Sequence, residues 1–120
     1  MVSNPFRRDD DNPPVVIIGL GRFGLAVARS LVAMGQEVLA VDVDPVRVQR
    51  VADEFTHVVQ ADSTDRDALE QLGIQTFDKA VVGISNNVES SVMTALALVD
   101  YGIPDIWAKA STKTQGRILE

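Results

Sequence analysis

The chain has 120 residues, of which 46% are hydrophobic and 23% charged, a balance typical of one globular domain with its own core. Eleven basic and seventeen acidic residues give a net charge of −6, which excludes a broad contact with nucleic acid phosphates, because such a contact needs a positive surface. The chain has no cysteine and one histidine, so disulfides, thiolate chemistry and a zinc site are excluded, and we identify no metal-ligating residue.

The start of the chain, residues 1–14 (MVSNPFRRDDDNPP), carries adjacent charges and three prolines. It lacks the apolar segment of a secretory signal. We therefore expect residues 1–13 to form a flexible, solvated tail and residues 14–120 to form the folded domain. No apolar run approaches the roughly 18 to 20 residues that a membrane-spanning helix needs.

Strand and helix patterns alternate along the rest of the chain. Short apolar runs rich in β-branched residues predict strands buried on both faces, at 14–18, 37–42, 57–60, 78–84 and 105–109. Apolar residues at helical spacing predict helices at 22–34, 45–55, 65–72 and 88–101, and another that begins after Ser111. Because right-handed crossovers place the helices on both faces, this order predicts an α/β fold with a Rossmann-like, doubly wound parallel sheet.

A G-x-G-x-x-G sequence lies between the first predicted strand and the first predicted helix. Its first glycine permits a tight turn, its second lets the backbone approach phosphates, and its third lets the helix pack closely on the sheet. The free N–H groups at the start of the helix then point at the anion. The predicted phosphate site consists of Gly19, Leu20, Gly21, Arg22, Phe23 and Gly24.

An acidic residue, Asp42, ends the second predicted strand about 20 residues further on, as in dinucleotide-binding folds. Its carboxylate can accept two hydrogen bonds from a ribose diol, and it repels a 2′-phosphate. NAD(H) or an adenosine di- or triphosphate is therefore favoured over NADP(H). The alternative is that the glycines merely end a strand and that Asp42 is a solvated end residue.

Polar residues after the other strands complete the predicted crevice, each with a simpler alternative. Arg22 can reach a phosphate of its own nucleotide or of one bound next door, or can be a surface arginine. Asp62 can accept a hydrogen bond from an adenine amino group, or can be a turn residue. Lys109 can pair with a terminal phosphate, or can simply be exposed. The set also includes Val43 after Asp42, Ser63 after Asp62, and Ile84, Ser85 and Asn87, of which Asn87 can instead cap the next helix.

The sequence offers little of what an enzyme needs. A dehydrogenase needs a substrate pocket and a tuned acid or base, usually on a second domain. The chain also lacks a G-x-x-x-x-G-K-S/T loop, a cysteine nucleophile and a convincing serine and histidine pair. We therefore expect a sensor without catalytic residues, in which ligand binding biases shape or assembly. The alternative is an NAD-dependent oxidoreductase, or a fragment of one.

Three segments carry a resemblance to a known family: 16–24 (VIIGLGRFG), 35–42 (GQEVLAVD) and 103–110 (IPDIWAKA). From about Val15 to the end, the chain closely resembles the RCK (KTN, TrkA-N) domains that regulate bacterial Ktr and Trk potassium uptake systems. The resemblance implies a cytoplasmic regulatory subunit that forms rings beneath a membrane potassium channel. ATP or ADP, and in related proteins NAD(H), would occupy the crevice, and ligand exchange would reshape the ring and control potassium transport.

The resemblance also implies roles for single residues. Arg22 would reach the terminal phosphate of a nucleotide in a neighbouring subunit, and Asp42 would bind the ribose. Arg47 would lie near the adenosine, Asp62 near the adenine and Lys109 at the crevice edge. Members of the family continue into a C-terminal module beyond the point where this chain ends, so we expect a dimer here rather than an octameric ring. The expected dimer contacts are apolar residues of the late helices, such as Leu98, Val99 and Tyr101.

Overall fold

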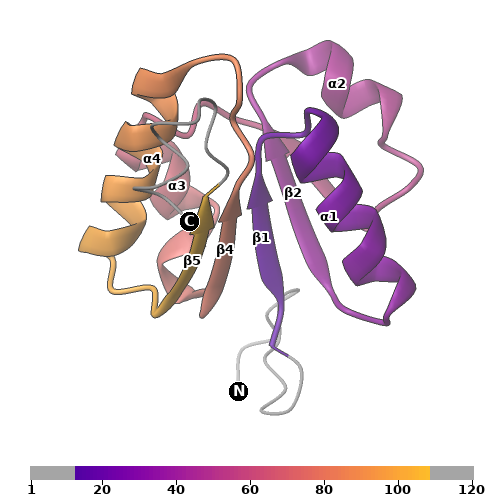
Figure 1. The fold of residues 1–120 in the computed structure, drawn as a ribbon, viewed down its shortest axis with the longest axis horizontal. Helices are drawn as coiled ribbons and strands as arrows, with labels where there is room; N and C mark the ends of the chain where they lie inside the picture. The colour runs from indigo at the N-terminus through magenta and orange to yellow at the C-terminus, as the bar shows by residue number, and fades with distance from the viewer. Residues whose placement is uncertain (1–12, 109–120) are drawn as a thin grey trace.

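Five parallel strands among the described residues form one sheet in the order β3-β2-β1-β4-β5, of which Figure 1 labels β2, β1, β4 and β5. The computed structural model describes residues 13–108, so Lys109 and the helix expected after Ser111 lie outside the described residues. The strand order reverses between β1 and β4, which makes the carboxyl ends of these two strands the topological switch point. The strands are β1 (Val15–Ile18), β2 (Val38–Asp42), β3 (His57–Gln60), β4 (Lys79–Val82) and β5 (Asp105–Ala108).

Helices cover both faces of the sheet, as Figure 1 shows. The helices that follow β1 and β2 lie on one face, and those that follow β3 and β4 lie on the other, because right-handed crossovers change face where the strand order reverses. The elements are α1 (Arg22–Ala33), α2 (Pro45–Arg50), α3 (Arg66–Gln71), the 3₁₀ turn η1 (Ile74–Thr76) and α4 (Val88–Asp100). The predicted doubly wound, Rossmann-like α/β fold is confirmed.

The central strands are buried on both faces because they feed two cores. Alternate residues of β1 and β2 point to opposite sides, so Val16 and Ile18 join the core under α3 and α4, whereas Val15 and Ile17 join the core under α1 and α2. This division explains why the strands read as uninterrupted apolar runs rather than as alternating ones.

Three elements differ from the sequence prediction. The helix α2 ends at Arg50 rather than near Phe55, although Val51 and Phe55 are still buried in turns that follow it. Acidic residues at 53 and 54 disfavour a longer helix, because negative charge at a helix C-terminus opposes the helix dipole. The strand β4 ends at Val82 rather than at Ile84, and the turn η1 has no counterpart in the prediction.

A groove lies on the α1 face of the sheet, between α1 and β5. It has a volume of about 420 Å³, and its apolar walls include Phe23, Val27 and Leu31 of α1 together with Val81 and Trp107. Trp107 is 63% exposed on the edge strand β5. No helix among residues 13–108 is long and apolar enough to cross a membrane.

The first helix packs against the end of β1 without room for a side chain at Gly24. A Cβ atom at this position would lie 1.7 Å from the carbonyl oxygen of Gly19. Gly19 has a φ of +101°, a conformation that favours glycine, and a Cβ there would lie 2.8 Å from the main chain of Gly83. The turn between β1 and α1 is therefore built by backbone packed on backbone.

We predict that Gly24→Ala lowers the free energy of unfolding by more than about 3 kcal/mol, because the obstacle is backbone that cannot move aside. Gly21→Ala is the matched control, since a Cβ at Gly21 meets only side-chain atoms at 3.9 Å. The control should lose no more than about 1 kcal/mol. Urea unfolding of both variants measures the difference, and equal losses would contradict the packing argument.

Candidate functional site

A polar crevice of about 370 Å³ opens at the carboxyl ends of β1 to β4, at the switch point of the sheet. The first turn of α2 and the first turn of α4 form its rims. Its lining residues are Ile18, Gly19, Asp42, Val43, Asp44, Arg47, Ala61, Asp62, Ser63, Thr64, Ile84, Asn86, Asn87 and Ser90. The volume suits a small ligand, and the location is where doubly wound folds bind theirs.

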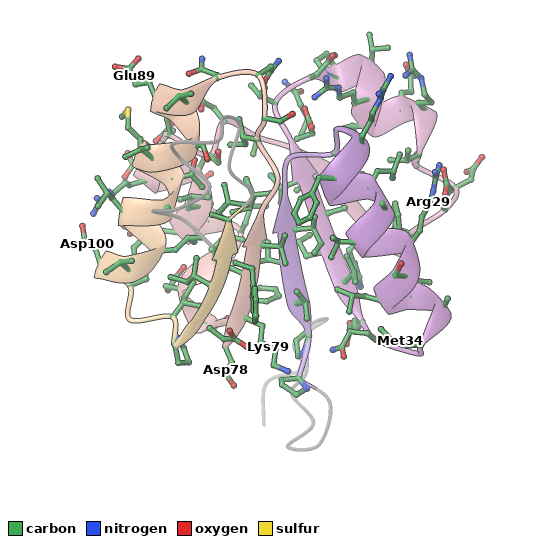
Figure 2. The ribbon with its side chains drawn as sticks, in the orientation of Figure 1. Arg29, Met34, Asp78, Lys79, Glu89 and Asp100 are labelled. Atoms are coloured by element: carbon green, nitrogen blue, oxygen red, sulfur yellow. The ribbon has the colours of Figure 1, made fainter. Side chains whose placement is uncertain are left out.

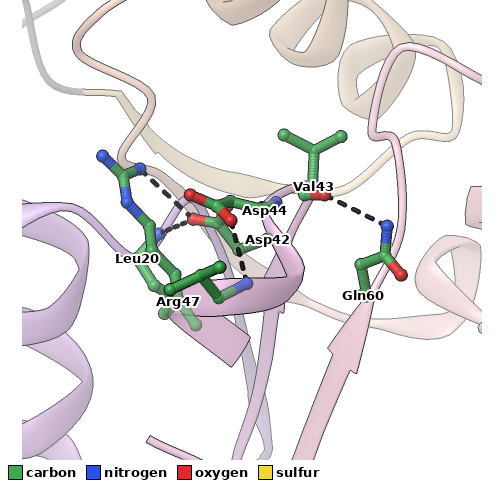
Figure 3. Close-up of polar contacts among 7 residues, drawn as sticks. Leu20, Asp42, Val43, Asp44, Arg47 and Gln60 are labelled. Carbon is green, nitrogen blue, oxygen red and sulfur yellow. Dashed lines mark hydrogen bonds and ion pairs between the residues drawn. The ribbon is translucent and has the colours of Figure 1, made fainter. Parts of the chain in front are cut away.

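Asp42 is the buried acid of this crevice, with only 4% of its surface exposed. Its Oδ2 accepts the N–H of Leu20 at 2.6 Å, and its Oδ1 accepts the N–H of Asp44 at 2.8 Å (Figure 3). Asp42 is therefore not the solvated end residue of the alternative interpretation. A carboxylate has about four acceptor positions, so two bonds leave capacity for a ribose diol.

Arg47 of α2 lies between the acid and the glycine turn. Its Nη1 is 3.6 Å from Asp42 Oδ2, and it is 3.9 Å from the place where a Cβ of Gly21 would stand. The Ser85 hydroxyl lies equally close to that place, so Arg47 and Ser85 flank the turn. Arg47 thus offsets the buried negative charge and places a cation beside the expected path of the phosphates.

Side-chain bonds hold the connection from β2 to α2. Asp44 caps α2, because its side chain accepts the N–H of Val46 and Pro45 supplies the first helical residue. Gln60 at the end of β3 donates to the Val43 carbonyl at 3.1 Å (Figure 3). The rim of the crevice beyond Asp42 is therefore fixed from two sides.

Asp62 forms a tight local turn at the opposite rim. Its Oδ1 accepts the Thr64 hydroxyl at 2.6 Å and the Thr64 N–H at 2.9 Å. These two bonds lower the pKa of Asp62, the hydroxyl bond more than the backbone bond. Asp62 is thus a turn residue, as the alternative interpretation held, and it is also one of the residues that line the crevice.

The start of α4 forms the distal wall. Asn87 caps this helix, because its side chain accepts the Ser90 N–H at 3.0 Å, so the capping alternative is confirmed. Asn87 and Ile84 line the crevice together with Asn86 and Ser90.

The structure separates the predicted residues into groups. Those that line the crevice are Gly19, Asp42, Val43, Arg47, Asp62, Ser63, Ile84 and Asn87. Leu20 contributes its N–H to Asp42, and Gly21 borders Arg47 and Ser85. The side chains of Leu20 and Phe23 belong to the core under α1 and α2, and Gly24 packs on Gly19. Arg22 is exposed as the first residue of α1 and is not among the lining residues.

Sequence reasoning left several lining residues out of the predicted set, among them Asp44, Thr64 and Ser90. An available signal for Asp44 was its position before Pro45, since an aspartate followed by proline is typical of a helix start. The others lie within three residues of predicted positions, where spacing alone does not tell which side chains face inward.

The sheet order and the crevice define a Rossmann-like domain of the nucleotide-binding class of folds. The TrkA-N domain model matches residues 15–120, and the chain belongs to this family. The family resemblance drawn from the sequence is confirmed.

Known relatives are potassium uptake proteins. The chain is 40% identical over 109 residues to Ktr system potassium uptake protein A of Bacillus subtilis, and 38% identical over 103 residues to protein C of the same organism. These alignments cover 91% and 86% of this chain but 49% and 47% of the two relatives. The chain therefore spans about half the length of these relatives.

Two solved structures that share the fold are described as bound to, or binding, a nucleotide. The Shewanella denitrificans Kef CTD in its AMP-bound form is 26% identical, with a TM-score of 0.67 over 85% of this chain and 62% of that one. The NAD(P)-binding domain of an exopolyphosphatase-related protein from Archaeoglobus fulgidus is 25% identical, with a TM-score of 0.65 over 88% of this chain and 78% of that one.

We predict that Thr64→Val raises the pKa of Asp62 toward its ordinary value, because the hydroxyl bond is the larger cause of the lowered pKa. Thr64→Ser keeps a hydroxyl and should keep the low pKa. A carboxyl whose pKa is lowered by folding stabilises the protein above the unfolded-state value of about 3.9, and this contribution is lost as the pH falls through the folded-state pKa. Carbon NMR titration of the side-chain carboxyls measures the shift, and identical curves for both variants would contradict the assignment.

Proposed function

We propose that this domain binds an adenine nucleotide in the crevice and thereby regulates a potassium transport system. The proposed ligands are ATP or ADP, with NAD(H) as a further candidate. The observation that carries the proposal is the buried carboxylate of Asp42, held by the N–H of Leu20 beside the glycine turn. A carboxylate next to the main-chain N–H groups at the start of a helix complements a ribose and its phosphates.

The proposed ligand lies along the crevice from the glycine turn to the rim at Asp62. Gly21, the N-cap of α1, makes no side-chain capping bond, so phosphate oxygens can take the place of a capping side chain at the start of this helix. The ribose hydroxyls bind Asp42, and the adenine lies between Val43 and the main chain of Asp62 and Ser63. The AMP-bound Kef relative and the NAD(P)-binding relative support a ligand of this class.

We propose a regulatory role rather than catalysis. The single histidine, His57, begins β3, at the end of the sheet opposite the crevice, and lies 3.8 Å from Glu37. It therefore cannot serve as an acid or base at the crevice. The potassium uptake proteins among the relatives support a partner that moves potassium across a membrane. We propose that this domain lies on the cytoplasmic side of that membrane.

A row of exposed apolar residues on α4 suits self-association. Val88, Val92, Leu96 and Val99 repeat at helical spacing along one side of the helix. Figure 2 shows Glu89 and Asp100 near the two ends of this helix. We propose that two copies of the chain associate along this row.

The contacts named from the sequence need correction here. Leu98 is fully buried in the core and cannot meet another subunit. Tyr101 is half-buried, and its hydroxyl bonds to Glu70 and to the Arg66 carbonyl. Only Val99 of the three is exposed, because the helix turns its other apolar side onto the sheet.

Calorimetric titration with ATP, ADP, AMP, NAD⁺ and NADH tests the proposed function. We expect ATP and ADP to bind in the crevice, and a clear preference for the dinucleotides would favour the redox alternative. Absence of binding by all five would defeat the proposal. Asp42→Ala should weaken every one of these ligands, since each carries the ribose.

Arg22 is predicted to recognise the terminal phosphate of a nucleotide in a neighbouring subunit, consistent with its exposure outside the crevice. Arg22→Ala should therefore weaken ATP about tenfold and ADP far less, the effect of losing one charge-assisted hydrogen bond. Arg29→Ala is the control, because Arg29 lies on the same helix but pairs with Glu54. Equal losses for ATP and ADP would refute this role.

Leu96→Asp should shift the chain from dimer to monomer, because it places a charge in the middle of the apolar row. Met34→Asp is the matched control, since Met34 is also exposed and apolar but ends α1 on the other face of the sheet. Sedimentation equilibrium of both variants measures the change. A dimer that survives Leu96→Asp would place the interface elsewhere.

A further inference from the structure

We propose that Thr94, a buried residue of α4 outside the crevice, positions the adenine side of the site through the hydroxyl of Ser63. This inference rests on the proposed function and adds a residue that neither the glycine motif nor the crevice lining identifies. Thr94 is a positioning residue, because it acts on the ligand only through another residue.

The contact joins two segments that are 31 residues apart in the sequence. The Ser63 and Thr94 hydroxyl oxygens lie 2.7 Å apart, and the Thr94 hydroxyl is 3.4 Å from the Ser63 carbonyl oxygen. Thr94 has no exposed surface, and Ser63 is 6% exposed. A hydroxyl pair in such surroundings has little access to water, so each group depends on the other for its hydrogen bond.

The bond anchors a loop that is otherwise shaped locally. The bonds from the Thr64 N–H and hydroxyl to the Asp62 carboxylate, and from the Asp65 N–H to the Asp62 carbonyl, close the turn on itself. The Ala61 N–H donates to the Asp42 carbonyl at 3.0 Å and ties the start of the loop to β2. The contact with Thr94 ties its middle to α4, so the loop is held at two points on two elements.

This anchoring determines what the loop presents to a ligand. The Ser63 hydroxyl is engaged with α4, so the groups that Ser63 and Asp62 offer on the crevice side are the main chain and the Asp62 carboxylate. Their position relative to Asp42 decides whether an adenine and its ribose can be bound together. Loss of the Thr94 hydroxyl would free the loop middle while leaving the glycine turn untouched.

Thr94→Val tests the proposal, because valine has nearly the same shape as threonine and lacks the hydroxyl. We expect it to weaken AMP about threefold to tenfold, the worth of one ordinary hydrogen bond, and to leave inorganic pyrophosphate unchanged. Thr94→Ser keeps a hydroxyl and should retain most of the AMP affinity. Ser91→Ala is the matched control, since Ser91 lies one turn earlier on the same buried side and its hydroxyl has no hydrogen-bond partner among the described residues.

Amide hydrogen exchange gives a second readout that needs no ligand. The amides of residues 62–64 should exchange faster in Thr94→Val than in the wild type, and at the wild-type rate in Ser91→Ala. Unchanged exchange in Thr94→Val, or equal losses of AMP and pyrophosphate, would overturn the positioning role. Wild-type protein that binds neither compound would instead defeat the proposed function, while the exchange data would still decide whether Thr94 anchors the loop.

Discussion

The hydrogen bond from the Leu20 N–H to the Asp42 carboxylate is the constraint on which the crevice depends. It joins the turn after β1 to the end of β2, so the two parts of the candidate site cannot move independently. The bond requires the turn after β1 to pack closely against the end of β2. The backbone can do so only because Gly19 adopts a positive φ and Gly24 lacks a side chain. The Asp44 N–H and Arg47 complete the neutralisation of a carboxylate that is almost fully buried.

Much of the fold could be predicted because its sequence signals are local. The strands β1 and β2 read as unbroken apolar runs since both of their faces are buried, and Gly19 to Gly24 mark a turn whose geometry few other residues permit. The end of α2 was not predictable from apolar spacing, because Val51 and Phe55 are buried whether they lie in a helix or in turns.

In the candidate site too, residues with a local sequence signal could be predicted and residues that depend on distant contacts could not. Asp42 could be predicted because its distance from the glycine turn is fixed by one helix and one strand. Thr94 gave no such signal, since its partner is 31 residues away and a threonine in a helix is unremarkable by itself. The sequence signal for Thr94 is limited to its spacing from Ser91, which places both residues on the buried side of α4. Contacts between distant segments become visible only once the topology is known.

The open groove between α1 and β5 has an optical consequence. Trp107 is the single tryptophan of the chain, it is largely exposed, and it shares the groove with Phe23 on the first turn of α1. That turn begins at Arg22, directly after the N-cap Gly21 of the glycine turn. The molecule therefore carries a native fluorophore beside the helix that would meet a phosphate, so that a change in the tilt of that helix, or cover placed over the groove, alters its emission without any added label.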